Sequence, residues 1–248
     1  GFTVPGQGTW SVNSTTGAVT FTPQTGYTGN PTPVNYTVRD NGGAISNQAS
    51  ITITYPTVAI SGTVVNDANN SNTILDGTET GTNAGGLFVY LVDASNNIIG
   101  KSTVAANGTY SVTAAQNTAY TLRLSSQDLA TGGSAATLTN QLPAGWVATG
   151  EGLNNTDDGT VNGIINLSTG TAPIANANFG IQQPPTAMND EILGEPGQPV
   201  EVNVLANDTD PAPGTLDATR VSLIAPGGAT GVTTDAEGDV TGFTVPGQ

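Results

Sequence analysis

Short stretches in which apolar and polar residues alternate recur along the whole chain. They cover residues 18–22, 34–38, 50–55, 59–64, 87–91, 109–112, 120–124, 163–167, 200–205 and 221–224. Alternation at period two puts every second side chain on the same face of a β-strand. Turn sequences such as Asn107-Gly108 and Asp158-Gly159 separate these stretches. Short strands at this spacing, with almost no helical periodicity, predict an all-β protein built of tandem immunoglobulin-like antiparallel β-sandwiches.

Proline residues mark two joints between the predicted strands. Pro56 follows a completed strand pattern, and Pro184 and Pro185 follow another before a new pattern starts. Proline fixes φ and pushes the preceding residue toward extended geometry, so such segments form short, semi-rigid linkers. The chain therefore divides into three predicted stretches, 1–55, 56–183 and 184–248.

One seven-residue sequence occurs twice in the chain. Residues 1–7 (GFTVPGQ) recur letter for letter at 242–248, an offset of 242 − 1 = 241 residues. Chance does not account for this identity, so the chain reads as one unit of a tandem array with a period of about 241 residues. A duplicated chain end is the alternative, and it requires the same parent repeat.

The first and last stretches together carry a family resemblance. The relevant motifs are 185–190 (PTAMND), 204–211 (VLANDTDP), 17–23 (GAVTFTP) and 32–40 (TPVNYTVRD). Joined in the order 184–248 and then 8–55, these residues resemble one CshA-type fibril repeat, a β-sandwich module of bacterial surface adhesins. The resemblance implies that 1–55 is the C-terminal part of one repeat and 184–248 is the N-terminal part of the next.

The middle stretch, 56–183, resembles a second family. Its motifs are 60–67 (ISGTVVND), 76–81 (DGTETG), 89–93 (VYLVD), 106–110 (ANGTY) and 142–146 (LPAGW). They are similar to the B-type repeat of serine-aspartate surface proteins, which is related to the Cna B-type sandwich. Such modules form stalks that hold a binding head away from the cell, and the resemblance implies the same duty here.

Composition narrows the range of functions. The chain has no His and no Cys, 4 Lys+Arg against 19 Asp+Glu, and a net charge of −15. A Ser-His-Asp triad, thiol catalysis, disulfides and zinc-thiolate sites are therefore excluded. So few basic residues do not neutralise a phosphate backbone, and no apolar run is long enough to span a membrane. We expect no enzyme, no nucleic-acid partner and no membrane insertion.

The strongest candidate site is a loop rich in oxygen ligands. Ca²⁺ binds six to eight oxygens, which flexible loops supply at alternate positions with a closing carboxylate about twelve residues on. The candidate ligands in this loop are Asp67, Asn69, Ser71, Thr73, Asp76 and Glu79. Glu79 falls one residue late, and Asn72 stands where such loops usually have glycine. A solvated turn is the alternative, and the B-type resemblance favours calcium.

Two further acidic clusters are candidate calcium sites. Asp157 and Asp158 are adjacent carboxylates, which are more stable beside a cation than beside each other. Asp190, with Asp208 and Asp210, resembles the acidic groups near the ends of cadherin-like modules. For the last cluster the sequence favours the alternative, an ordinary Asx-turn, over a calcium site.

Taken together, these features predict a structural repeat of a long, secreted bacterial surface fibre or adhesin stalk, outside the cell and rigidified by Ca²⁺. A carbohydrate- or protein-binding adhesin module, recognising a host or surface ligand, is the alternative. A glycan-active enzyme with paired carboxylates is a more distant one. Trp10 and Trp146 are assigned to core packing rather than to sugar stacking.

Neighbouring copies of the repeat are the expected partners. Stretch 1–55 carries Phe21, Tyr36 and Ile51 on strand faces for which it has no second sheet, and 184–248 carries Val202 and Leu223 with the same deficit. Sheet faces left in water form large apolar patches. We therefore expect the two stretches to complete one fold between adjacent copies, in a covalent array or a head-to-tail filament.

Overall fold

The structure is a computed structural model that describes residues 1–25, 27, 29–69, 77 and 79–246. Strands, turns and two single-turn 3₁₀ helices make up this part of the chain, and no α-helix occurs in it. The prediction of an all-β protein is confirmed at this level. Two compact units divide the chain, residues 1–182 and 183–248.

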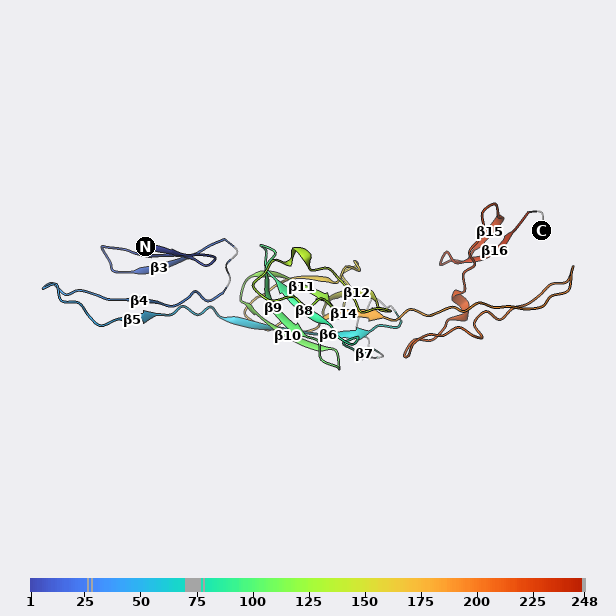
Figure 1. Cartoon of the computed structure of the whole chain (residues 1–248), viewed down its shortest axis with the longest axis horizontal. Coiled ribbons are helices and arrows are strands. Elements are labelled where there is room, and N and C mark those ends of the chain that lie inside the picture. The colour runs from blue at the N-terminus through green and yellow to red at the C-terminus, as the bar shows by residue number, and fades with distance from the viewer. Residues whose placement is uncertain (26, 28, 70–76, 78, 247–248) are drawn as a thin grey trace. The chain divides into compact units, whose positions relative to one another are not determined.

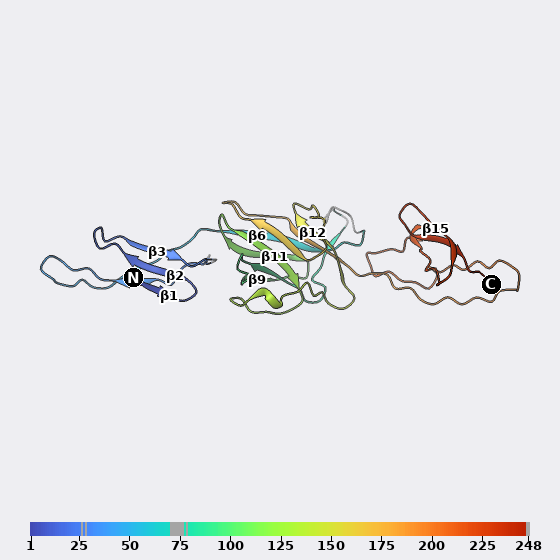
Figure 2. The same cartoon turned by 90° about the horizontal axis from the view of Figure 1, so that it is seen from above.

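The N-terminal residues form two small antiparallel sheets. β1 (Phe2–Val4), β2 (Gly8–Val12) and β3 (Val19–Pro23) lie side by side in that order (Figure 2), and β4 (Val34–Tyr36) pairs with β5 (Ala49–Ile51). Trp10 of β2 is buried, with 2% of its surface exposed. Its ring centre lies 5.0 Å from that of Phe21 on β3. This burial agrees with the core role predicted for Trp10.

A five-stranded sheet begins the central part of the chain. Its strands are β6 (Thr57–Asn66), β7 (Thr80–Gly81), β10 (Thr109–Ala115), β12 (Val147–Leu153) and β14 (Ala177–Gln182). The order is β10-β6-β14-β12, and β7 pairs with the end of β6. β14 runs parallel to β6, so this sheet is mixed. The prediction of purely antiparallel sheets is wrong here, because alternation reports a strand's faces and not the direction of its neighbour.

A four-stranded antiparallel sheet accompanies it. β8 (Phe88–Val92) lies between β9 (Ile98–Thr103) and β11 (Ala119–Ser125), and β13 (Ile164–Ser168) pairs with the other edge of β11. Figure 1 shows these strands grouped with those of the mixed sheet. One hydrophobic cluster draws side chains from both sheets, among them Ile60, Leu91, Leu122, Ile165 and Phe179. The central part is therefore two β-layers around a shared core.

β8 is buried on both of its faces. Tyr90 and Val92 point away from the main core into a second cluster with Ile98, which Ala135 of η1 (Ala135–Thr137) helps to cover. The Tyr90 hydroxyl accepts a hydrogen bond from the Leu129 N–H at 2.8 Å. The alternation predicted for residues 87–91 is wrong, because burial on two faces makes 87–92 apolar throughout.

The second unit, 183–248, has little regular structure. It contains η2 (Ala218–Arg220) and an antiparallel hairpin of β15 (Thr230–Thr234) and β16 (Val240–Thr244). The strands predicted at 200–205 and 221–224 are absent from the described residues of this unit. Both segments have the alternating pattern, but a strand also needs a ladder of backbone hydrogen bonds to a neighbour. The Leu223 N–H donates to the Val240 carbonyl of β16 at 2.9 Å, but this bond does not continue into a ladder among the described residues.

Candidate functional site

The ends of the loop that follows β6 are held together by strand pairing. Asn66 of β6 lies opposite Thr80 of β7, and Val65 lies opposite Gly81. Asp67 and Glu79 are the next residues at each side of the loop base, so the structure places them at its two ends. Asn69 is exposed in the turn that follows Asp67. The other predicted ligands of this loop, Ser71, Thr73 and Asp76, lie outside the described residues.

Asp67 is a buried carboxylate, with 1% of its surface exposed. Its N–H donates to the carbonyl of Ile181 at 2.9 Å, which extends the β6–β14 pairing by one residue. Its Oδ2 accepts a hydrogen bond from the Thr149 hydroxyl at 2.6 Å. Thr149 stands at an irregularity of β12, where the register with β14 shifts between Ala148 and Gly150.

Two glycines make room for acidic side chains beside this bulge. Gly150 of β12 lies opposite Gly180 of β14. A Cβ at Gly180 would lie 2.8 Å from Oδ2 of Asp67, and a Cβ at Gly150 would lie 2.6 Å from Oδ2 of Asp157. Directly opposed residues of an antiparallel pair share one face of the sheet. The carboxylates of Asp67 and Asp157 therefore lie over the same face, above the same glycine pair.

This convergence was not anticipated from the sequence, which places Asp67 and Asp157 in separate candidate sites 90 residues apart (157 − 67). Asp158 is turned elsewhere: its Oδ1 accepts hydrogen bonds from the N–H of Thr160 at 3.0 Å and from the Thr160 hydroxyl at 2.6 Å. Of the two adjacent acids, Asp157 is thus the one directed toward Gly150.

Glu151 supports the loop that carries Asp157 and was missed in the sequence. Its side chain is buried, and its Oε1 accepts the N–H groups of Asn162 at 2.8 Å and Gly163 at 2.9 Å. Its carbonyl accepts the N–H of Asp158 at 2.9 Å. Burial raises the pKa of the Glu151 carboxyl above its ordinary value of 4.5, although these hydrogen bonds oppose the rise. None of the alternating stretches of the sequence includes residues 147–153, so no sequence signal pointed to it.

The third acidic cluster lies in the second unit. Thr186 and Thr209 bond to each other's backbone at 2.8 and 3.0 Å, which brings the segment of Asp190 beside that of Asp208 and Asp210. Oδ1 of Asp208 accepts the N–H of Met188 at 2.7 Å. A Cβ at Gly214 would lie 2.6 Å from the Asp210 carboxylate. These contacts describe a folded-back loop pair in which Asp208 binds backbone of the Asp190 segment and Asp210 faces Gly214 of its own segment.

The chemistry that these residues offer is that of carboxylate and hydroxyl oxygens, which suits a hard cation. Within the described residues, no group of three or more Asp or Glu side chains comes close enough together to hold a metal ion. The same part of the chain contains no helix long and apolar enough to cross a membrane. Trp146 is partly buried against the main core.

Comparison with known families gives one match. Residues 1–58 match the family model described as the surface adhesin CshA repetitive domain. This agrees with the resemblance seen in stretch 1–55, and it shows that this part of the chain is similar to a surface adhesin repeat. Nothing in the comparisons supports a Cna B-type domain over 56–183. A comparison with curated proteins found no match.

Proposed function

We propose that this chain is a structural repeat unit of a secreted bacterial surface fibre or adhesin stalk. The observation that carries the proposal is the match of residues 1–58 to a surface adhesin repetitive domain. The recurrence of residues 1–7 at 242–248 supports a tandem array with a period of about 241 residues. The unit works on the outside of the cell and has no catalytic role; it spaces the modules of the stalk.

The proposal assigns immunoglobulin-like sandwiches to the repeat, with a B-type module in the middle. Two β-layers around the core that includes Ile60 and Leu122 support a sandwich for this part. A net charge of −15 makes each unit repel its neighbours, which keeps copies soluble and favours extension. A glycan- or protein-binding role is less well supported, because Trp10 is buried and does not offer its ring to a ligand.

Length measurement tests the stalk role directly. Chains of one, two and four units are imaged by rotary-shadowing electron microscopy. A stalk gains a constant contour length for each added unit, because each module contacts only its neighbours. Four units that collapse into a particle no longer than two units contradict the proposal.

We further propose that Ca²⁺ binds near Asp67 and stiffens the central part. The support is the buried Asp67 carboxylate, the position of Glu79 at the other end of the loop base, and the approach of Asp157 to the same face. In this proposal Asp67 and Asp157, predicted in separate sites, serve one cation. The candidate residues of the second unit, Asp190, Asp208 and Asp210, are proposed as a separate and weaker site.

Thermal melting of the full chain tests the calcium site. A ligand that binds only the folded state stabilises it by about 2.7 kcal/mol at a hundredfold excess over Kd. We expect Ca²⁺ to raise Tm relative to EDTA, and Asp67→Ala or Asp157→Ala to abolish most of that rise. Asp128→Ala, which removes an exposed partner of Lys101, is the matched control and keeps the calcium response. An equal Tm in Ca²⁺ and EDTA counts against the site.

A further inference from the structure

The repeated seven-residue segment pairs differently at its two positions. At residues 1–7 it forms β1, in which Phe2 lies opposite Trp10 and Thr3 lies opposite Thr9 of β2. At residues 242–248 it contributes to β16, in which Gly242 lies opposite Thr233 and Thr244 lies opposite Thr230 of β15. Identical residues thus pair with β2 at one position and with β15 at the other; residues 247–248 lie outside the described part.

We propose that in consecutive copies one strand of this sequence pairs with both neighbours at once. The residues that end one copy and begin the next then form the second strand, paired on both edges, of a four-stranded antiparallel sheet in the order β15, shared strand, β2, β3. The occupant of the open edge of β1 is β15 of the preceding copy. This inference rests on the proposed tandem repeat and names the surface through which its copies join.

The register of the two pairings agrees across the shared strand. Thr3 and Thr244 are the same position of the repeat. Thr230 lies opposite Thr244, Thr3 lies opposite Thr9, and Thr9 lies opposite Thr22 of β3. The joined sheet therefore has a row of threonines that runs across all four strands. The Thr3 and Thr9 hydroxyl oxygens are already 3.1 Å apart, and cross-strand threonine pairs of this kind stabilise sheets.

The opposite face of the joined sheet is aromatic. Phe2 lies opposite Trp10, and Trp10 lies opposite Phe21, so the three rings share one row. The Phe2 side chain is 55% exposed, which leaves the end of this row open to water. The equivalent Phe243, which has β15 beside it, is half-buried. The same position of the repeat is thus less exposed where β15 pairs beside it.

Glycine at the first position of the segment fits this arrangement. A Cβ at Gly1 would lie 2.5 Å from the carbonyl oxygen of Trp10. A Cβ at Gly242 would lie 3.1 Å from Oγ1 of Thr233. The same position is crowded by β2 in one setting and by β15 in the other. A strand position that β2 approaches this closely, and that β15 also crowds, favours a residue without a side chain.

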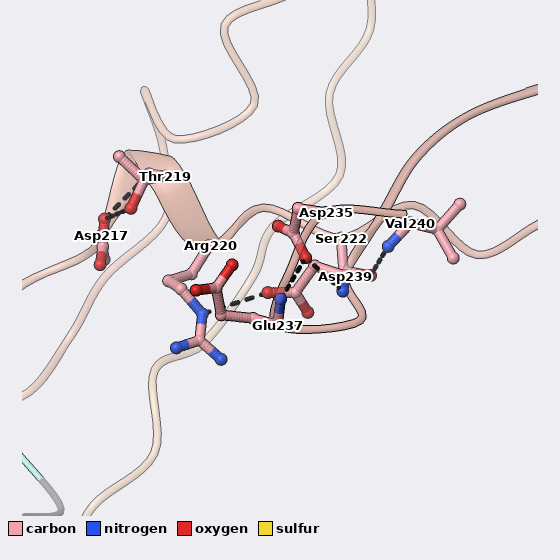
Figure 3. Close-up of polar contacts among 8 residues, drawn as sticks. All are labelled: Asp217, Thr219, Arg220, Ser222, Asp235, Glu237, Asp239 and Val240. Carbon is pink, nitrogen blue, oxygen red and sulfur yellow. Dashed lines mark hydrogen bonds and ion pairs between the residues drawn. The ribbon is translucent and has the colours of Figure 1, made fainter. Parts of the chain in front are cut away.

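The hairpin that offers β15 is held at its closed end. Oδ1 of Asp235 accepts the N–H groups of Glu237 at 3.1 Å and Asp239 at 2.8 Å (Figure 3). Arg220 binds the Asp239 carboxylate at 3.1 Å, and the Val240 N–H donates to Ser222 at 2.9 Å. These contacts fix β16 at Val240. Phe243, three residues further on, is the position that pairs with β2 in the joined sheet.

Hydrogen exchange on a chain of two repeat copies tests the shared strand at their junction. In this chain, residue 248 of the first copy of the repeat continues at residue 8 of the second copy. The repeated segment therefore stands once at each end of the chain and once at the junction. Peptides that span the junction distinguish the middle copy by mass spectrometry. Because both edges of the middle strand are paired, we expect its amides to exchange about tenfold more slowly than those of both terminal copies. Equal exchange in all three copies overturns the proposal.

A matched pair of variants separates β15 from β2 as the source of protection. Thr233→Pro in the first copy removes an N–H from β15, the strand beside the junction, and proline does not fit a strand interior. We expect this variant to raise amide exchange at the junction strand by about tenfold, and to raise exchange in β2 of the second copy as well. The same substitution in the second copy affects only the C-terminal hairpin of the chain. A junction that stays protected with the first variant overturns the proposed sheet.

This test is independent of the wider proposal. Contour length that grows with unit number, together with unprotected junction strands, would leave the stalk role intact and reject the shared sheet. A protected junction in chains that do not extend would reject the stalk role and leave the shared sheet.

Discussion

Glu151 puts an acid inside the central core region of the chain. Its carboxylate accepts two backbone N–H groups from the loop at 162–163, and its burial raises the pKa of the carboxyl. The folded chain therefore holds this proton more tightly than the unfolded chain does. The resulting stability is complete below the ordinary pKa of 4.5 and is lost as the pH rises through the raised pKa.

We expect Glu151→Gln to remove this pH dependence. Glutamine keeps a carbonyl oxygen for the N–H groups of Asn162 and Gly163, but it has no charge to bury. The variant should be at least as stable as the native chain at pH 7, and its stability should change less between pH 4.5 and 7. Urea denaturation at a series of pH values measures this. Glu195→Gln, at an exposed position, is the control; a native-like pH profile for Glu151→Gln contradicts the assignment.

At the scale of the element, close backbone approach decides where the central strands meet. Gly108, in the turn before β10, has φ +79°, and a Cβ there would lie 2.2 Å from the Val64 carbonyl oxygen of β6. The Gly108 carbonyl in turn accepts the N–H of Val64 at 2.9 Å. The turn therefore packs directly on β6, close to the base of the loop that holds Asp67.

We predict that Gly108→Ala destabilises the chain far more than Gly132→Ala. Both glycines have left-handed φ, +79° and +86°, but nothing lies within 4 Å of a Cβ at Gly132. Left-handed φ alone costs an alanine about 1–2 kcal/mol, and the clash with Val64 is added only at Gly108. Chemical denaturation of both variants gives the comparison. Equal losses of stability would show that the close approach at Gly108 relaxes freely.

At the scale of the whole molecule, burial is distributed unevenly. The two hydrophobic clusters draw all of their buried residues from 60–181. None of the described residues from 183 to 246 is buried, and Leu193 and Ile224 are 100% and 94% exposed. Apolar burial is the main source of folding stability, so the central part is expected to be far more stable than the second unit.

Limited proteolysis of the 248-residue chain should reveal this difference in stability. Cleavage requires local opening, whose population is higher where few side chains are buried. We expect thermolysin to remove residues 183–248 first and to leave a resistant fragment that contains 57–182. Mass spectrometry identifies the fragment. Simultaneous loss of the second unit and the central part would contradict the expected order.

The strands themselves were largely predictable from the sequence. Alternation at 109–112 and 120–124 corresponds to β10 and β11, and 18–22 corresponds to β3. Alternation of apolar and polar residues is a local property, because alternating side chains fit a strand with one buried face wherever its partner strand lies. The CshA-type resemblance also came from local motifs, and the family match over 1–58 confirms it for that part.

Other features depended on contacts between distant residues. The pattern of β14 says nothing of its parallel pairing with β6, and the alternating segment 200–205 forms no strand in the single chain. Asp67 and Asp157 lie over the same face only because the pairing of β6, β14 and β12 brings Gly150 opposite Gly180. A sequence pattern determines which face of a strand is apolar. The identity and direction of the neighbouring strand come from long-range packing, and these decide which polar groups meet.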